Sequence, residues 1–165
     1  MAVEALRPSE HTITAHLVVN GGDQALEFYQ KAFGAQVSGL HKTPDGKVMH
    51  AELKIGDSKI MLADEFPGMG SSSPATLGGS GVILNILVPD VDKLFDQAVR
   101  AGATVTMPLA NQFWGDRYGR ITDPFGHHWA LLQHVEEVTP EEMERRAREA
   151  FAHMSKVGSQ PKQKP

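Results

Sequence analysis

Two side chains in the first half of the chain have the types and spacing needed for acid–base or metal chemistry. His50 and Glu52 alternate along the predicted strand 47–55, so both lie on the face opposite its apolar residues. A histidine beside a carboxylate can bind an ion or pass a proton, which makes Glu52 the candidate catalytic residue. Alternatively, His50 is a hydrogen-bonded histidine and Glu52 is its partner or a solvated strand residue.

A third polar position pairs with a position far along the chain. His16 lies on a predicted strand that alternates from His11 to Val19. Aligning the end of this strand with the end of the predicted strand 82–88 pairs His16 with Asn85. Asn85 is the polar break in the apolar run GVILNILV. We therefore expect both residues to bind ligand, with His16 as a satisfied strand histidine being the alternative.

The segment 112–118, QFWGDRY, combines aromatic and charged side chains in a predicted loop. In a functional interpretation, its aromatic residues form the wall of a pocket and its arginine binds a carboxylate or phosphate. The candidate ligand-binding residues of this loop are Phe113, Trp114, Arg117 and Tyr118. In a structural interpretation, Trp114 fills the core or a dimer interface, and the charged residues of the loop pair with Arg120 or Asp123.

These residues must be positioned by elements that occur twice. Residues 16–35 and 85–103 each read as a short apolar strand, an acidic turn, an amphipathic helix and a Gly-Ala ending. Each copy is followed by further strand-like alternation. In the first copy Asp23 is the predicted N-cap and Gly34 ends the helix, and in the second copy the helix is predicted to start near Asp90 and to end at Gly102. A site between two such copies should draw matching positions from both.

The repeat predicts one domain with additions at both ends. A Gly-, Ser- and Pro-rich segment separates the copies and is either a linker or a lid over a pocket. A capping box at 139–142 starts a helix outside the repeat, and its apolar stripe must pack on the domain or on a partner. The predicted segments are a polar lead-in (1–10), a domain (11–135) with modules 11–64 and 81–135 and linker 65–80, a helix (139–155) and a disordered tail (156–165).

Composition excludes several classes of function. The chain has 165 residues, a net charge of −4 and no cysteine. This mild charge predicts neither nucleic-acid binding nor binding to an anionic membrane, and no apolar run approaches a membrane span. The missing cysteines exclude a zinc-thiolate site, and there is no glycine-rich loop for a nucleotide cofactor. We expect a cytoplasmic protein.

The motifs of the repeat resemble those of a known superfamily. Ala25–Tyr29 followed by Phe33–Ala35, and Trp114–Gly119 followed by Asp123–Gly126, resemble the vicinal-oxygen-chelate superfamily of glyoxalases, bleomycin-resistance proteins and dioxygenases, in particular its PhnB-like branch. The resemblance covers about residues 11–135. It implies an α+β fold in which two βαβββ modules form a curved, mostly antiparallel eight-stranded sheet around an open cavity. It also implies a homodimer that binds a small molecule.

The resemblance further implies where a metal would bind. In metal-using members, strands of both copies hold a divalent ion such as Zn, Ni, Mn or Fe, which would here contact His16, His50 and Glu52. The usual first ligand position falls on Thr14, and the usual carboxylate position on the last strand is Ala130. This apolar residue disfavours a metal. The function is then either a metal-dependent lyase, isomerase or dioxygenase-like enzyme, or a metal-free protein that sequesters an antibiotic or metabolite, with an interaction module as a third possibility.

Overall fold

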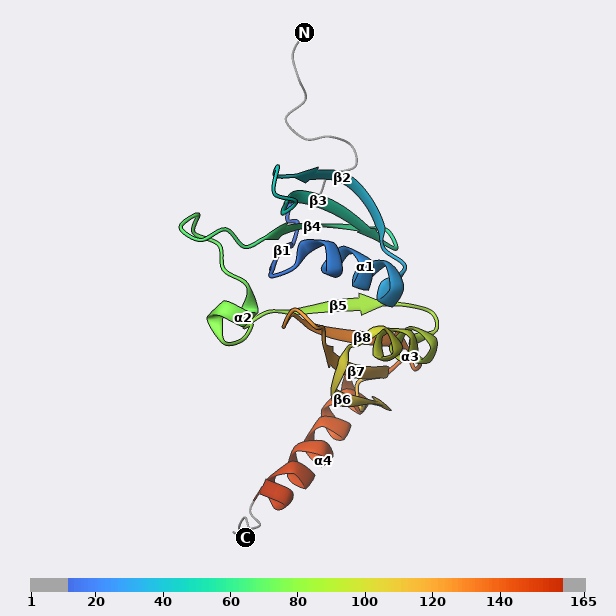
Figure 1. The fold of residues 1–165 in the computed structure, drawn as a ribbon. Helices are drawn as coiled ribbons and strands as arrows, with labels where there is room; N and C mark the ends of the chain where they lie inside the picture. The colour runs from blue at the N-terminus through green and yellow to red at the C-terminus, as the bar shows by residue number, and fades with distance from the viewer. Residues whose placement is uncertain (1–11, 159–165) are drawn as a thin grey trace.

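The computed structural model describes residues 12–158, with side chains as far as residue 152, as two similar modules followed by a helix (Figure 1). The first module contains β1 (His16–Val19), α1 (Gly22–Phe33), β2 (Gln36–Lys42), β3 (Val48–Ile55) and β4 (Ser58–Asp64). The second contains β5 (Ile83–Leu87), α3 (Val91–Ala101), β6 (Thr104–Asn111), β7 (Asp116–Thr122) and β8 (His128–His134). A short helix, α2 (Pro74–Leu77), lies between the modules, and α4 (Pro140–Gly158) follows them.

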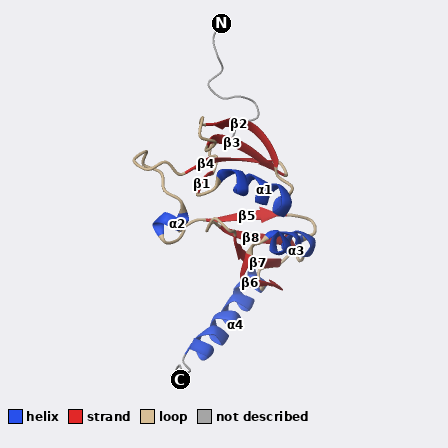
Figure 2. Cartoon of the chain, viewed as in Figure 1, coloured by secondary structure: helices blue, strands red, loops and turns tan. Residues whose placement is uncertain are grey.

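The eight strands confirm the predicted fold class. They form two four-stranded sheets with matching orders, β1-β4-β3-β2 and β5-β8-β7-β6 (Figure 2). In each sheet the first strand pairs parallel with the last, and the other pairs are antiparallel. Within residues 12–158 no hydrogen-bonded ladder joins the two sheets. The sheet is therefore interrupted between the modules.

One helix covers one face of each sheet and leaves the other face open. α1 lies against the first sheet and α3 against the second, and the two helices also pack on each other (Figure 1). The side-chain amide of Gln97 on α3 donates to the carbonyls of Lys31 (2.9 Å) and Ala32 (3.1 Å) at the end of α1. The two modules are thus joined through their helices, as expected for layers that bury one apolar face each.

A buried carboxylate reinforces this joint. Asp123 accepts hydrogen bonds from the Tyr29 hydroxyl of α1 (2.7 Å) and from the indole of Trp129 on β8 (2.8 Å). Its other oxygen accepts the backbone N–H groups of Phe125 and His127, both at 2.9 Å. Burial, followed by the charge of Asp123, raises the pKa of Tyr29 well above its ordinary value, so Tyr29 remains a donor. The Asp-Pro-Phe-Gly turn therefore has a structural role.

The predicted helix ends are correct at three of four positions. Gly34 and Gly102 take left-handed backbone angles, with φ of 65° and 118°, and end α1 and α3. Asp90 caps α3 by accepting the N–H of Lys93 at 3.1 Å. These caps are local, which is why the sequence predicts them.

The predicted N-cap of α1, Asp23, is wrong. The N-cap is Gly21, whose φ is 100°, and the capping oxygen comes from Asp64 at the end of β4. Asp64 accepts the N–H groups of Gly21 (3.0 Å) and Gly22 (2.8 Å), while Asp23 pairs with Lys42 instead. A carboxylate that is distant in sequence has replaced the local one, because the end of β4 lies beside the start of α1.

Strand boundaries differ from the predictions at β1, β6 and β7. β1 begins at His16 rather than at residue 11, which itself lies outside the described residues. β6 extends beyond the strand expected near residues 104–107 and continues to Asn111 through bulges around Pro108. Proline lacks a backbone N–H, and an edge strand such as β6 tolerates this loss. β7 starts at Asp116, so the predicted loop 112–118 is only a short hairpin turn.

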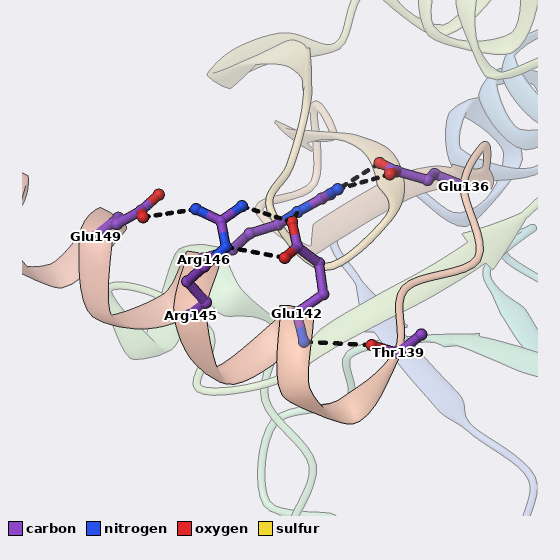
Figure 3. Close-up of polar contacts among 6 residues, drawn as sticks. All are labelled: Glu136, Thr139, Glu142, Arg145, Arg146 and Glu149. Atoms are coloured by element: carbon purple, nitrogen blue, oxygen red, sulfur yellow. Dashed lines mark hydrogen bonds and ion pairs between the residues drawn. The ribbon is translucent and has the colours of Figure 1, made fainter.

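The last helix is held at its base by ion pairs (Figure 3). The Thr139 hydroxyl accepts the N–H of Glu142 (3.3 Å), which confirms half of the predicted capping box. The Glu142 carboxylate turns instead to Arg145 and Arg146, and Arg146 also contacts Glu136. α4 includes residues 156–158 of the predicted tail, while residues 159–165 and 1–10 lie outside the described part. No helix within residues 12–158 is long and apolar enough to cross a membrane.

Candidate functional site

The open face of the first sheet brings two of the predicted histidines together. The rings of His16 on β1 and His50 on β3 lie 6.4 Å apart, edge to face. In the strand register, both His16 and Glu52 pair with Met61 of β4, so Met61 lies between them. Two strand spacings separate His16 from Glu52 by about 9–10 Å between backbones. The Glu52 carboxylate accepts from the Lys59 ammonium (3.2 Å), so it is already paired.

The protonation state of His16 follows from this environment. Partial burial, and then the nearby His50, lower the pKa of His16 below its ordinary value of 6.5. His16 is therefore a neutral imidazole at pH 7, the form that can accept a proton or bind an ion. Of the three residues predicted to act together, His16 and His50 therefore lie close to each other, whereas Glu52 is paired with Lys59.

The position paired with His16 in the second module lies elsewhere. Asn85 on β5 pairs with Ala130 on β8. Ala130 is the position at which a metal-binding carboxylate was expected, so this position lies opposite the Asn85 amide. His16 lines a cavity of about 260 Å³ with His127 and His128, whereas Asn85 lines a different cavity. Within residues 12–158 no three His, Cys, Asp or Glu side chains gather closely enough to hold a metal ion. The copies match in architecture but do not converge on one site.

The aromatic residues of the β6–β7 hairpin form a contiguous wall. The Phe113 and Trp114 rings are 5.0 Å apart, and the Trp114 and Tyr118 rings 5.7 Å apart, both edge to face. The Trp114 indole donates to Asp116 (3.0 Å), whose other oxygen contacts His134 at 3.1 Å. This aromatic wall is fixed in place by its own neighbours.

The arginine of this hairpin is paired, as the structural interpretation expected, but with a different partner. Arg117 lies on β7 and makes two short bonds to Asp92 of α3, at 2.6 and 2.7 Å. A third bond reaches Asn111 at 3.2 Å. Arg120 and Asp123, the partners predicted for the charged residues of this hairpin, are both wrong, because α3 brings the Asp92 carboxylate over β7. A free ligand anion would have to displace Asp92.

A cavity that the sequence does not reveal lies between the two modules. It has a volume of about 550 Å³. Its walls come from both modules and are mostly apolar: Phe33 of α1, Ile55 and Ile60 around the β3–β4 turn, Leu84 and Ile86 of β5, and Trp129 of β8. Of the residues predicted to bind ligand, only Asn85 lines it. The signal available in the sequence was the apolar run around Asn85, which is equally typical of ordinary core residues.

Fold and site together define a two-module βαβββ protein with a cavity between its modules. The profile of the glyoxalase/bleomycin resistance protein/dioxygenase superfamily matches residues 10–131. The chain belongs to this superfamily.

Individual relatives agree with this assignment. A protein of Mycobacterium tuberculosis strain H37Rv is 46% identical over 138 residues, which cover 82% of this chain and 81% of the relative. The crystal structure of an Arabidopsis thaliana gene product is 30% identical, with a TM-score of 0.61, and covers 74% of this chain and 98% of that one. A PhnB protein from Bacillus cereus, 18% identical with a TM-score of 0.59, covers 74% of this chain and 99% of its own and shares the fold.

Proposed function

We propose that this protein binds a small, mostly apolar molecule in the cavity between its two modules. The observation that carries the proposal is the cavity itself. Its volume of about 550 Å³ lies within the range of small-molecule sites, roughly 300–1,000 Å³. Its apolar walls with a few polar groups are also typical of such sites. Bleomycin-resistance proteins, which the superfamily name includes, support a binding role.

The contacts that join the two modules also fix one wall of the cavity, so the cavity is already formed before a ligand binds. The Tyr29–Asp123–Trp129 hydrogen bonds link α1 to β8, and Trp129 also lines the cavity. Phe33 packs on Trp129 with ring centroids 4.8 Å apart. A wall built this way needs little ordering when ligand binds, so little binding free energy is lost.

A neutral fluorescent probe tests the proposal. N-phenyl-1-naphthylamine has about 17 non-hydrogen atoms, and at about 0.4 kcal/mol each its binding free energy would be roughly −7 kcal/mol. This corresponds to a Kd on the order of 10 µM, measurable by the rise in probe fluorescence.

Two variants of the same strand give a matched comparison. Ile86→Trp places an indole in the cavity and should weaken binding at least about tenfold. Ile83→Trp makes the same change at the first residue of β5, which does not line the cavity, and should leave the affinity unchanged. If Ile86→Trp fails to fold, Ser58→Trp at the exposed mouth replaces it. Equal binding to all variants would refute the proposal.

The His16–His50 pair supports a second candidate, a metal-assisted enzyme. A neutral His16 beside His50 offers two imidazoles on one open face, and imidazole suits Zn or Ni. Isothermal titration with Zn²⁺ should then show binding that is lost in His50→Ala and kept in His134→Ala. Zn²⁺ binding that is unchanged in His50→Ala, or absent from the wild type, would reject this candidate.

A further inference from the structure

The walls of the cavity between the modules carry little charge. Among the described residues that line it, the only ionisable side chain is Asp57, in the β3–β4 turn. Asp57 is exposed, and one of its oxygens accepts from the Ser58 hydroxyl at 2.8 Å. No lysine, arginine or histidine in residues 12–158 contributes to the lining. An anionic ligand group would therefore be desolvated beside a carboxylate, with no cation to pair with it.

The nearest strand lysines do not change this charge distribution. Lys54 and Lys59 pair with each other across β3 and β4, one row before the turn. Their neighbours Ile55 and Ile60 line the cavity, and successive residues of a strand point to opposite faces. Both lysines therefore lie on the open face of the first sheet, where Lys59 is bound to Glu52.

The cavity nevertheless offers hydrogen-bonding groups along β5. The Val88 N–H donates to Leu132 of β8, so alternate residues back along β5 direct their backbone groups to β8. The N–H and C=O groups of Asn85 and Leu87 then point to the other edge, where no strand in the described part of the chain pairs with β5. Both residues line the cavity. A ligand with a neutral polar group can bond there.

We propose that the cavity selects apolar molecules that carry neutral or basic polar groups and excludes anions such as carboxylates, phosphates and sulfonates. This inference rests on the proposed function, since it assigns a ligand class to the same cavity. Selection comes from three features together: apolar walls, the edge of β5 as hydrogen-bonding partner, and Asp57 as the single charge at the mouth.

Two probes that share one aromatic frame test the selection. N-phenyl-1-naphthylamine is neutral, and 1-anilinonaphthalene-8-sulfonate is the same frame with a sulfonate. Each is titrated into the wild type, and cavity binding is taken as the part that Ile86→Trp removes. We expect the sulfonate to bind at least about tenfold more weakly than the neutral probe. Asp57→Lys should bring the two affinities to within about threefold, and Asp57→Asn should lie between.

Three other outcomes would each overturn part of the proposal. If both probes bind equally and Ile86→Trp abolishes both, the anion exclusion is wrong and the cavity remains a ligand site. If Asp57→Lys leaves a tenfold difference unchanged, the assigned role of Asp57 is wrong. If the neutral probe fails to bind, or binds Ile86→Trp as well as the wild type, the proposed function fails and the selection fails with it.

Discussion

Replacing Asp123 by alanine should destabilise the protein more than any single change on its surface. Asp123 is 4% exposed and accepts four hydrogen bonds, two of them from side chains of different modules. The Tyr29 hydroxyl and the Trp129 indole are both buried and would lose this partner. The variant therefore tests whether this carboxylate joins the modules.

The magnitude follows from the two buried donors. A buried donor left without a partner costs about 1–3 kcal/mol, so two of them cost roughly 4 kcal/mol. The backbone N–H groups of Phe125 and His127 add less, because water can reach this partly exposed turn. Tyr29→Phe removes one donor and keeps the ring, and should cost only about 1–1.5 kcal/mol.

Urea unfolding followed by circular dichroism measures both variants. With a slope of about 2 kcal/mol/M, Asp123→Ala should lower the midpoint by roughly 2 M. The double variant with Asp123→Ala and Tyr29→Phe should lose about 1–2 kcal/mol less free energy of unfolding than the sum of the two single variants. The reason is that Tyr29→Phe has already removed one of the donors that Asp123→Ala leaves without a partner. A loss below about 1 kcal/mol for Asp123→Ala, or strict additivity with Tyr29→Phe, would show that Asp123 does not join the modules through these hydrogen bonds.

Three further predictions concern glycine, histidine and arginine. Gly22→Ala should cost about 2–4 kcal/mol in urea unfolding, since its Cβ would lie 2.6 Å from the capping carboxylate, whereas Gly81→Ala meets nothing and should be neutral. Hydrogen bonding to Asp116 raises the pKa of His134 above 6.5, so its stabilisation is complete below pH 6.5 and is lost as pH rises through the folded-state pKa. An NMR titration should show the His134 pKa falling in Asp116→Asn, and an unchanged pKa would contradict this. Arg117→Ala should leave the affinity for N-phenyl-1-naphthylamine, measured by fluorescence, within about twofold of the wild-type value. A tenfold loss would show that Arg117 contributes to ligand binding.

Most of the fold could be predicted because its signals are local and occur twice. The glycines at positions 34 and 102 and the N-cap Asp90 each act within one turn of their own helix. The cap of α1 could not be predicted, since Asp64 reaches it across 42 residues of sequence to bond Gly22. Local patterns do not report such contacts.

The site was less predictable than the fold. The residues predicted to act together lie in three places: the His16–His50 face, the intermodular cavity with Asn85, and the hairpin with Trp114. The cavity draws its walls from elements of both modules, and its apolar residues look like core residues in the sequence. Ala130, the usual carboxylate position, lies opposite Asn85, a pairing that the sequence did not predict. Homodimer formation and metal content stay predictions, which light scattering and elemental analysis would test.

A crystal structure of the protein with N-phenyl-1-naphthylamine would show whether the cavity between the modules binds ligand. We expect electron density for the probe between β5 and the β3–β4 turn, against Ile86 and Ile60, with its amine near the backbone of Asn85. Density on the Phe113–Trp114 wall or over His16 and His50, with the cavity between the modules empty, would contradict it.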